Sequence, residues 1–135
     1  MVMCENMPGK SDEGSVTTVR VIKAPPVSEA TVAETIAQAV DGYKRAFGNR
    51  LAQVWLFGSR ARGDHRPDSD VDLLVVLRAE ADLLADLDLI HAVANPLRLS
   101  SGVFVDGHAT TLQELETSDD EYHYFIRREG RRVDV

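Results

Sequence analysis

The chain has 135 residues, of which 44% are hydrophobic and 27% charged, with a formal net charge of -7. These values are typical of a soluble globular protein with one domain. No segment approaches the roughly 18–20 apolar residues that cross a bilayer, and residues 1–15 lack the continuous apolar core of a signal peptide. We therefore expect a cytoplasmic protein. Cys4 is the only cysteine, which excludes an intramolecular disulfide and a cysteine-rich zinc site.

The acidic excess lies in the C-terminal part of the sequence. Residues 1–57 carry six acidic and six basic residues, whereas residues 58–135 carry sixteen and nine. An acidic surface repels the nucleic-acid backbone, so we expect no direct nucleic-acid binding. Basic clusters within this acidic part suit a small phosphorylated ligand or a protein partner. These clusters are Arg60, Arg62 and Arg66, and Arg127, Arg128, Arg131 and Arg132.

Residues 1–27 are expected to form a flexible N-terminal arm. Residues 1–15 are polar and predicted to be disordered, and residues 15–22 are predicted to be extended. The domain, residues 28–135, begins with a helix that Ser28 can cap. The apolar face of this helix recurs at three- and four-residue intervals before the stop signal Gly48-Asn49. It consists of Val32, Ile36, Val40, Tyr43 and Phe47.

The pattern after this helix predicts a small α/β (α+β) domain with a short mixed sheet flanked by helices. Strands are predicted at 51–57, 70–77 and 102–109, and helices at 80–95, 111–117 and 119–129. The second strand is almost continuously apolar, which predicts burial on both faces. Pro96 is expected to disturb the end of the helix at 80–95. The inner face of that helix is predicted to contain Leu83, Leu87, Ile90 and Ala94.

Two aspartates, Asp70 and Asp72, open the second predicted strand. Because side chains two residues apart on a strand share a face, these carboxylates should project together. They would repel each other unless a cation neutralises them, and hard oxygen ligands suit Mg²⁺ or Mn²⁺. Solvated aspartates are also common at strand starts, so the pair alone does not identify a site.

A glycine-serine corner precedes the aspartates. Gly58 has no Cβ, so a phosphate could approach the backbone, and Ser59 can cap the following turn. Arg60 and Arg62 add positive charge and are predicted to bind the phosphates, with exposure to solvent as the alternative. A phosphate-binding corner beside a metal-binding pair suits a nucleoside triphosphate with its metal. A P-loop is excluded, because Asp64 and the residue after it replace the required Lys and Ser/Thr.

An EF-hand beginning at Asp68 is excluded as well, because Leu73 occupies the glycine position and Ala79 the final glutamate position. The remaining pattern is Gly-Ser, ten residues, and then Asp-x-Asp, at positions 58, 59, 70 and 72. It resembles the signature of the minimal nucleotidyltransferases of the DNA polymerase β superfamily. The resemblance extends over about residues 30–130.

This resemblance implies transfer of a nucleoside monophosphate, AMP from ATP foremost, to a hydroxyl group with release of pyrophosphate. Two metal ions about 3.5–4 Å apart would assist the reaction. The aspartate pair would hold the metals, and the glycine-serine corner would hold the β- and γ-phosphates. Family members usually add a third carboxylate from the next core strand, where Asp106 is the only acidic residue. Asp106 is predicted as that metal ligand, although Asp-Gly is also a common loop signal. His108 is interpreted mainly as a strand-end residue, with a polar contact near the site as the alternative.

The resemblance also implies a partner protein. Relatives of this length often act with a HEPN-type toxin, which they adenylylate as its antitoxin. A nucleotide-binding or partner-binding module without turnover is the alternative. An aminoglycoside-type transferase is a further alternative, but the chain lacks the second domain that usually forms the drug pocket.

Overall fold

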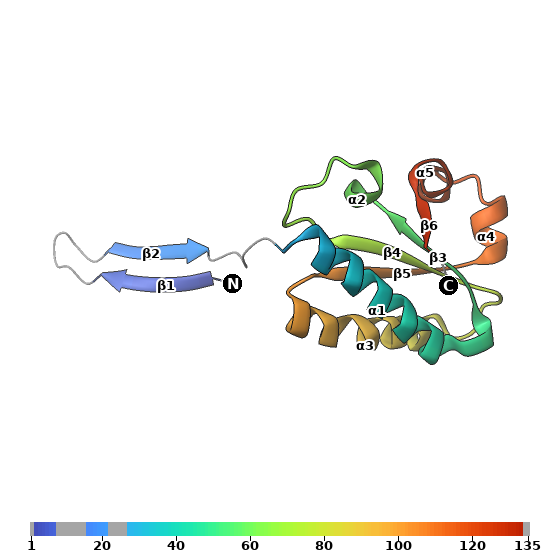
Figure 1. Ribbon diagram of the computed structural model, residues 1–135, viewed down its shortest axis with the longest axis horizontal. Helices are drawn as coiled ribbons and strands as arrows, with labels where there is room; N and C mark the ends of the chain where they lie inside the picture. Colours follow the sequence, from blue (N-terminus) through green and yellow to red (C-terminus); the bar gives the residue numbers. More distant parts are fainter. Residues whose placement is uncertain (1, 8–15, 22–26, 134–135) are drawn as a thin grey trace.

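The computed structural model describes residues 2–7, 16–21 and 27–133 of the chain (Figure 1). The helices are α1 (Glu29–Phe47), α2 (Ser59–Arg62), α3 (Leu83–Ser101), α4 (Leu112–Thr117) and α5 (Glu121–Glu129), and a 3₁₀ turn, η1 (Gly48–Arg50), follows α1. The strands after residue 27 are β3 (Leu51–Phe57), β4 (Val71–Leu77), β5 (Val105–Thr111) and β6 (Arg131–Val133).

These strands form one four-stranded sheet in the order β5-β4-β3-β6. β4 and β5 are parallel, whereas β3 is antiparallel to both β4 and β6. The crossover from β4 to the parallel strand β5 is made by α3, as parallel strands require. The sheet is therefore mixed and flanked by helices, which confirms the predicted fold class.

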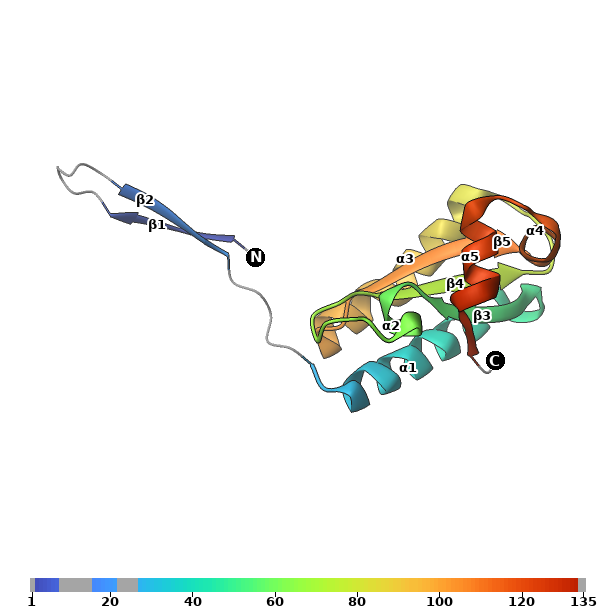
Figure 2. The ribbon, with the colours of Figure 1, turned by 90° about the horizontal axis from the view of Figure 1, so that it is seen from above.

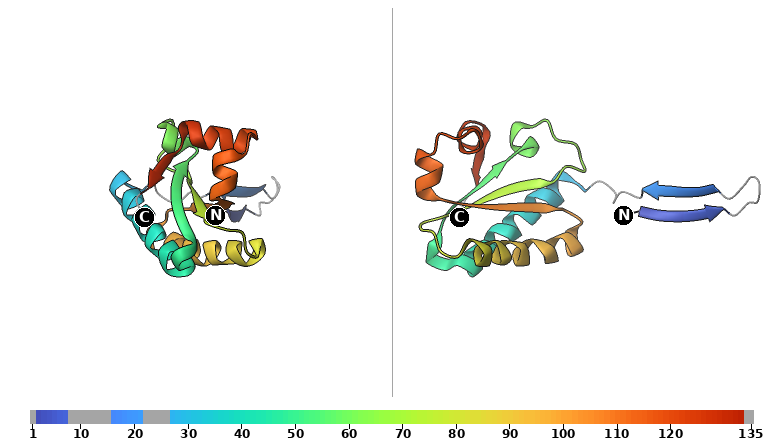
Figure 3. Two further views of the ribbon diagram at one scale, coloured as in Figure 1. Left: turned by 90° about the vertical axis from the view of Figure 1, so that its right-hand side faces the viewer. Right: turned by 180° about the vertical axis from the view of Figure 1, so that it is seen from behind.

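Helices cover both faces of the sheet, as Figures 1 and 2 show, and the end-on view in Figure 3 separates the two layers. Leu73 and Val75 of β4 pack in the larger core with α1 and α3. Leu74 and Val76 point to the opposite face and pack with residues of α4 and α5. All four side chains are fully buried, which confirms the predicted two-sided burial of this strand. By the same alternation, Asp72 belongs to the face that α4 and α5 cover.

The first helix begins and ends where local signals predict. The Ser28 side chain accepts a hydrogen bond from the N–H of Thr31, so Ser28 is the N-cap. Gly48 ends the helix with a φ of 55°, a region that glycine occupies readily. Val40 and Tyr43 of the predicted apolar face are buried in the core. This helix packs on the face of the sheet opposite α4 and α5.

The helix predicted at 80–95 is longer and starts later than expected. It runs from Leu83 to Ser101 with Pro96 inside it, so the expected disturbance at this proline does not end the helix. Its C-terminal part is retained because Leu97 packs against the core, and Gly102 ends it with a φ of 78°. Leu83 is 61% exposed and does not belong to the inner face as predicted.

The third strand is shifted relative to the prediction of 102–109. β5 begins at Val105, where it pairs with Val71 of β4, and continues to Thr111 opposite Leu77. Residues 102–104 connect it to α3 instead. β6 was not predicted, because two of its three residues are arginines and a short charged edge strand lacks the apolar signal of a core strand.

The N-terminal segment contains a two-stranded antiparallel sheet of β1 (Val2–Met7) and β2 (Val16–Val21). The predicted extended conformation of residues 15–22 is confirmed for 16–21. Residues 2–7, which we expected to be disordered, form a strand because pairing with β2 supplies backbone hydrogen-bond partners. The remainder of the segment expected to be disordered lies outside the described residues. In the part of the chain that the structure describes, no helix is long and apolar enough to cross a membrane.

Candidate active site

The corner between β3 and α2 depends on a glycine. Gly58 has a φ of 76°, and a Cβ added there would overlap Oδ2 of Asp72. Gly58 is also the N-cap of α2, and no side chain caps that turn, so the capping role expected for Ser59 is not observed. The positive φ of Gly58 makes the bend without help from a hydroxyl group. The backbone at Gly58 therefore lies directly against the Asp72 carboxylate.

Parallel pairing of β4 and β5 places Asp72 opposite Asp106. Their carboxylate oxygens and a ring nitrogen of His108 lie within 4.8 Å of one another, and all three residues are half-buried. Two carboxylates at this separation form a donor set that suits a divalent cation, because each can contribute an oxygen to a shared ion. The residues present thus fit the metal that the sequence predicts.

Asp70 lies at the edge of this group. It precedes the first residue of β4 and is exposed, and it does not belong to the set of ligand atoms within 4.8 Å. The backbone N–H of the next residue, Val71, donates to the carbonyl of Phe104, which holds the start of β4 against the loop before β5. The structure thus brings Asp72 and Asp106 together in one group, whereas Asp70, the first aspartate of the Asp-x-Asp motif, lies outside it.

The charges of the site raise the pKa values of its acidic groups. Burial and then the charge of Asp106 raise the pKa of Asp72. Partial desolvation of its carboxyl and then the charge of Asp106 raise the pKa of the more exposed Asp70. Burial and the charges of Asp106 and Asp72 raise the pKa of Tyr122 to about 12, so its hydroxyl remains protonated at neutral pH. Accumulated negative charge in a half-buried place is relieved by a bound cation.

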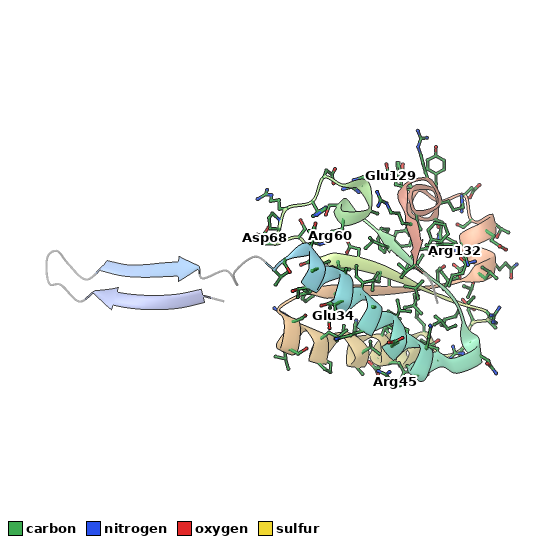
Figure 4. The ribbon with its side chains drawn as sticks, viewed as in Figure 1. Glu34, Arg45, Arg60, Asp68, Glu129 and Arg132 are labelled. Atoms are coloured by element: carbon green, nitrogen blue, oxygen red, sulfur yellow. The ribbon has the colours of Figure 1, made fainter. Side chains whose placement is uncertain are left out.

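The two arginines after the corner have different environments. The Arg60 side chain is only 4% exposed, and its guanidinium donates to the Glu29 carboxylate and to the carbonyls of Pro67 and Ser69. Figure 4 shows it between α2 and the beginning of α1. Arg62 is 43% exposed and lies near Asp64. We expected both to contact phosphate, but every nitrogen of the Arg60 guanidinium already has a protein partner.

Three ring side chains, Phe57, His108 and Tyr122, lie together beside the carboxylates, and sequence reasoning missed Phe57 and Tyr122. The ring centroids of Phe57 and His108 are 5.1 Å apart, and those of Phe57 and Tyr122 are 5.9 Å apart. His108 was considered as a polar contact near the site, and its Nε2 atom lies 3.2 Å from Asp106, which it follows by two residues on one strand. No local signal places Tyr122 there, because α5 reaches the site only through tertiary packing.

A polar chain with a buried histidine at its centre fixes α5 in this position. His123 Nδ1 lies 2.8 Å from Oδ1 of Asp120, the N-cap of α5, and its Nε2 lies 2.8 Å from Oγ1 of Thr110 on β5. The hydrogen bonds that Asp120 accepts from His123 and Ser118 lower the pKa of its carboxyl to about 2. This chain joins the helix to the strand that carries Asp106, so Tyr122 is held next to the site.

Residues 36–135 match the family described as the nucleotidyltransferase domain. This match covers most of the chain, so the chain belongs to that family, and the class of protein predicted from the Gly-Ser and Asp-x-Asp spacing is confirmed. A segment of 54 residues is 37% identical to MJ0604 of Methanocaldococcus jannaschii, whose name proposes it as a protein adenylyltransferase. The segment covers 40% of this chain and 54% of that protein, so it spans about half the length of this relative.

Several solved structures are more distantly similar. A candidate nucleotidyltransferase from Sulfolobus solfataricus is 23% identical, with 72% of this chain and 87% of that chain covered and a TM-score of 0.48. A complex of an AMPylated Shewanella oneidensis HEPN toxin with its MNT antitoxin is 17% identical, with 74% and 69% covered and a TM-score of 0.49. A toxin-antitoxin structure with AMP-PNP is 20% identical, with 78% and 72% covered and a TM-score of 0.48.

Proposed function

We propose that this chain transfers a nucleoside monophosphate, AMP from ATP, to a hydroxyl group of a partner protein and releases pyrophosphate. The observation that supports this most is the contact between the Gly58 corner and Asp72, which itself lies beside Asp106. A backbone that phosphate can approach and a pair of carboxylates are thereby adjacent. A metal-bound triphosphate needs both features in one place.

The proposed roles follow from this arrangement. When bound, a divalent cation, Mg²⁺ or Mn²⁺, would supply positive charge for the triphosphate and the leaving oxygen. Asp72 and Asp106 would hold it, with Asp70 as a further ligand at the edge of the group. Gly58 and Ser59 would face the β- and γ-phosphates. As the oxygen of the acceptor hydroxyl attacks the α-phosphorus, Asp106 would also accept the proton of that hydroxyl.

A protein acceptor suits the surface next to the site. Tyr122, Tyr124 and Phe125 of α5 are 40%, 43% and 49% exposed. Aromatic residues are enriched in protein–protein interfaces. We propose a HEPN-type toxin as this partner and antitoxin activity as the role, in line with the minimal nucleotidyltransferase resemblance and with the relative named for protein adenylylation. ATP as the donor would place the reaction in the cytoplasm.

The test is incubation of the chain with labelled ATP, Mg²⁺ and a HEPN-type partner. We expect the label on the partner, with a mass increase of one AMP residue, and no label when Asp72 and Asp106 are both replaced by Asn. Nucleotide binding without transfer to any protein would contradict the proposal and favour a binding module. Transfer to an aminoglycoside alone would contradict the protein acceptor.

A further inference from the structure

We propose that His108 is a nitrogen ligand of the metal site and that it makes this site prefer Mn²⁺ to Mg²⁺. This inference rests on the proposed function, because it concerns the same cation. It adds a metal ligand that the Asp-x-Asp pattern does not contain, and it assigns a metal preference to the site.

The first argument is the position of His108 in the sheet. It follows Asp106 by two residues on β5, so both side chains project from the same face. Asp72 of β4 lies opposite Asp106 in the parallel register, and Leu74 lies opposite His108. His108 therefore lies beside Leu74 on the neighbouring strand and next to the two carboxylates. Neighbours on two paired strands cannot separate without breaking the sheet.

The second argument is the orientation of the ring. The Nε2 atom of His108 lies 3.2 Å from Oδ2 of Asp106, so this nitrogen faces the carboxylates. A cation held by Asp72 and Asp106 would find a ring nitrogen of His108 within the same 4.8 Å group. In the metal-free protein Nε2–H donates the hydrogen bond to Asp106, so binding through Nε2 would require the neutral tautomer with its proton on Nδ1. Two bonds to the ion would then replace this hydrogen bond. No large movement of the ring is required.

The third argument is that the ring is held in place before any metal arrives. Phe57 contacts it edge-on at a centroid distance of 5.1 Å and an interplanar angle of 71°, and Tyr122 lies at 6.2 Å. The side chain of His108 is nevertheless 37% exposed, so an ion can reach it from solvent. A ligand that is already oriented loses less conformational entropy on binding.

The other histidines are not placed in this way. His65 lies 2.8 Å from the Glu29 carboxylate, and His123 is bound to Thr110 and Asp120. His91 is exposed on α3. Within residues 27–133, the group of Asp72, Asp106 and His108 is the one set of three possible ligands that lies close enough to share an ion.

Coordination chemistry then ranks Mn²⁺ above Mg²⁺ for this site. Mg²⁺ prefers oxygen ligands in near-ideal octahedral geometry, and an imidazole nitrogen is a poor partner for it. Mn²⁺ accepts carboxylate oxygens and water as Mg²⁺ does, and as a first-row transition metal it also binds imidazole. A site with two carboxylates and one imidazole therefore favours Mn²⁺. The imidazole strengthens the preference for Mn²⁺, because it contributes to Mn²⁺ binding and little to Mg²⁺ binding.

The experiment measures metal binding on the full chain without substrate. Mn²⁺ and Mg²⁺ are titrated by calorimetry, and pulsed electron paramagnetic resonance of bound Mn²⁺ records coupling to ¹⁴N. The variants are His108→Asn and His108→Gln, with His91→Asn as the matched exposed control, and circular dichroism checks that each is folded. We expect ¹⁴N coupling in the parent and the control, and none in the His108 variants. Loss of this ligand should weaken Mn²⁺ binding by about 10–100-fold and leave Mg²⁺ binding near the parental value.

The outcomes separate this inference from the proposed function. Bound Mn²⁺ without ¹⁴N coupling in the parent would overturn the role of His108 and leave the carboxylate site intact. This measurement uses the parent chain, so it tests the proposal even if a variant fails to fold. An equal loss of Mn²⁺ and Mg²⁺ affinity in His108→Asn would overturn the metal preference. No binding of either metal, with or without ATP, would overturn the proposed function itself.

Discussion

Gly58 and Asp72 lie so close together that a Cβ at position 58 would overlap the Asp72 carboxylate. The corner and the acid are 14 positions apart in sequence numbering, but antiparallel pairing of Phe57 with Asp72 makes them neighbours. A phosphate bound at the corner would therefore lie next to Asp72, which we propose as a ligand of the cation. This contact links the two halves of the motif in space.

Replacement of Gly58 by Ala should abolish metal-dependent ATP binding and lower stability. An alanine at position 58 would be held at a strained φ of 76°, and its Cβ would overlap the Asp72 carboxylate. Gly63→Ala is the matched control, because Gly63 has a φ of 86° but nothing within 4 Å of the added Cβ. The control should lose only about 1–2 kcal/mol of unfolding free energy and still bind ATP. Calorimetry and thermal denaturation measure both effects, and equal ATP binding by the two variants would show that the corner has no role in the site.

Replacement of Asp72 by Asn should stabilise the metal-free protein near neutral pH. The pKa of Asp72 is raised in the folded state by burial and by Asp106, so its contribution to stability is present at low pH and is lost as pH rises through that pKa. The amide removes this penalty. Thermal denaturation with a chelator should show a higher Tm for the variant, and the difference should shrink as pH falls.

Added Mg²⁺ or Mn²⁺ should reverse the order of the two Tm values, so that the parent has the higher one. The parent should gain Tm by ligand binding, whereas Asp72→Asn should gain little, because one of the two carboxylates that meet the ion is missing. Asp88→Asn, at an exposed position of α3, serves as the control and should respond to metal as the parent does. A metal-induced rise in Tm as large in Asp72→Asn as in the parent would remove Asp72 from the metal site.

Replacement of Asp106 by Asn should separate binding from catalysis. The amide keeps the size of the side chain but cannot accept the proton of the acceptor hydroxyl. ATP should still bind through the corner, Asp70 and Asp72, but more weakly than in the parent because one of the two carboxylates that meet the ion is missing, while transfer falls by a factor on the order of 10²–10⁴. Transfer is measured with labelled ATP and the partner protein. Parental rates in this variant would show that Asp106 takes no part in the reaction.

Replacement of Arg60 by Ala should act on the loop before β4. Its guanidinium joins Glu29 to the carbonyls of Pro67 and Ser69, so its loss leaves acceptors without a donor. We expect a loss of about 1–3 kcal/mol of unfolding free energy. The exposed neighbour Arg62→Ala should lose less than about 1 kcal/mol. Chemical denaturation measures both, and equal small losses would mean that the buried arginine does not hold the loop.

Local sequence signals determined most of the framework. The cap at Ser28 and the glycine at position 48 define α1, because a helix end is set by a few adjacent residues. The apolar run before Arg78 predicted a strand buried on both faces, since successive side chains point to opposite faces and the run is almost continuously apolar. The Gly-Ser and Asp-x-Asp spacing predicted the family because both ends of the motif lie on one short segment of chain.

Only the tertiary structure decided which groups meet. Asp106 lies beside Asp72 because β4 and β5 pair in a parallel register. The two strands are separated in sequence by α3, so no local pattern encodes that register. The Arg60 side chain is buried and donates hydrogen bonds to protein groups, although its place beside the Gly-Ser corner suggested that it faces phosphate or solvent. Tyr122 reaches the site because the Asp120–His123–Thr110 chain docks α5 on the sheet. Local patterns specify elements through near neighbours, whereas contacts between distant residues depend on how the elements pack together.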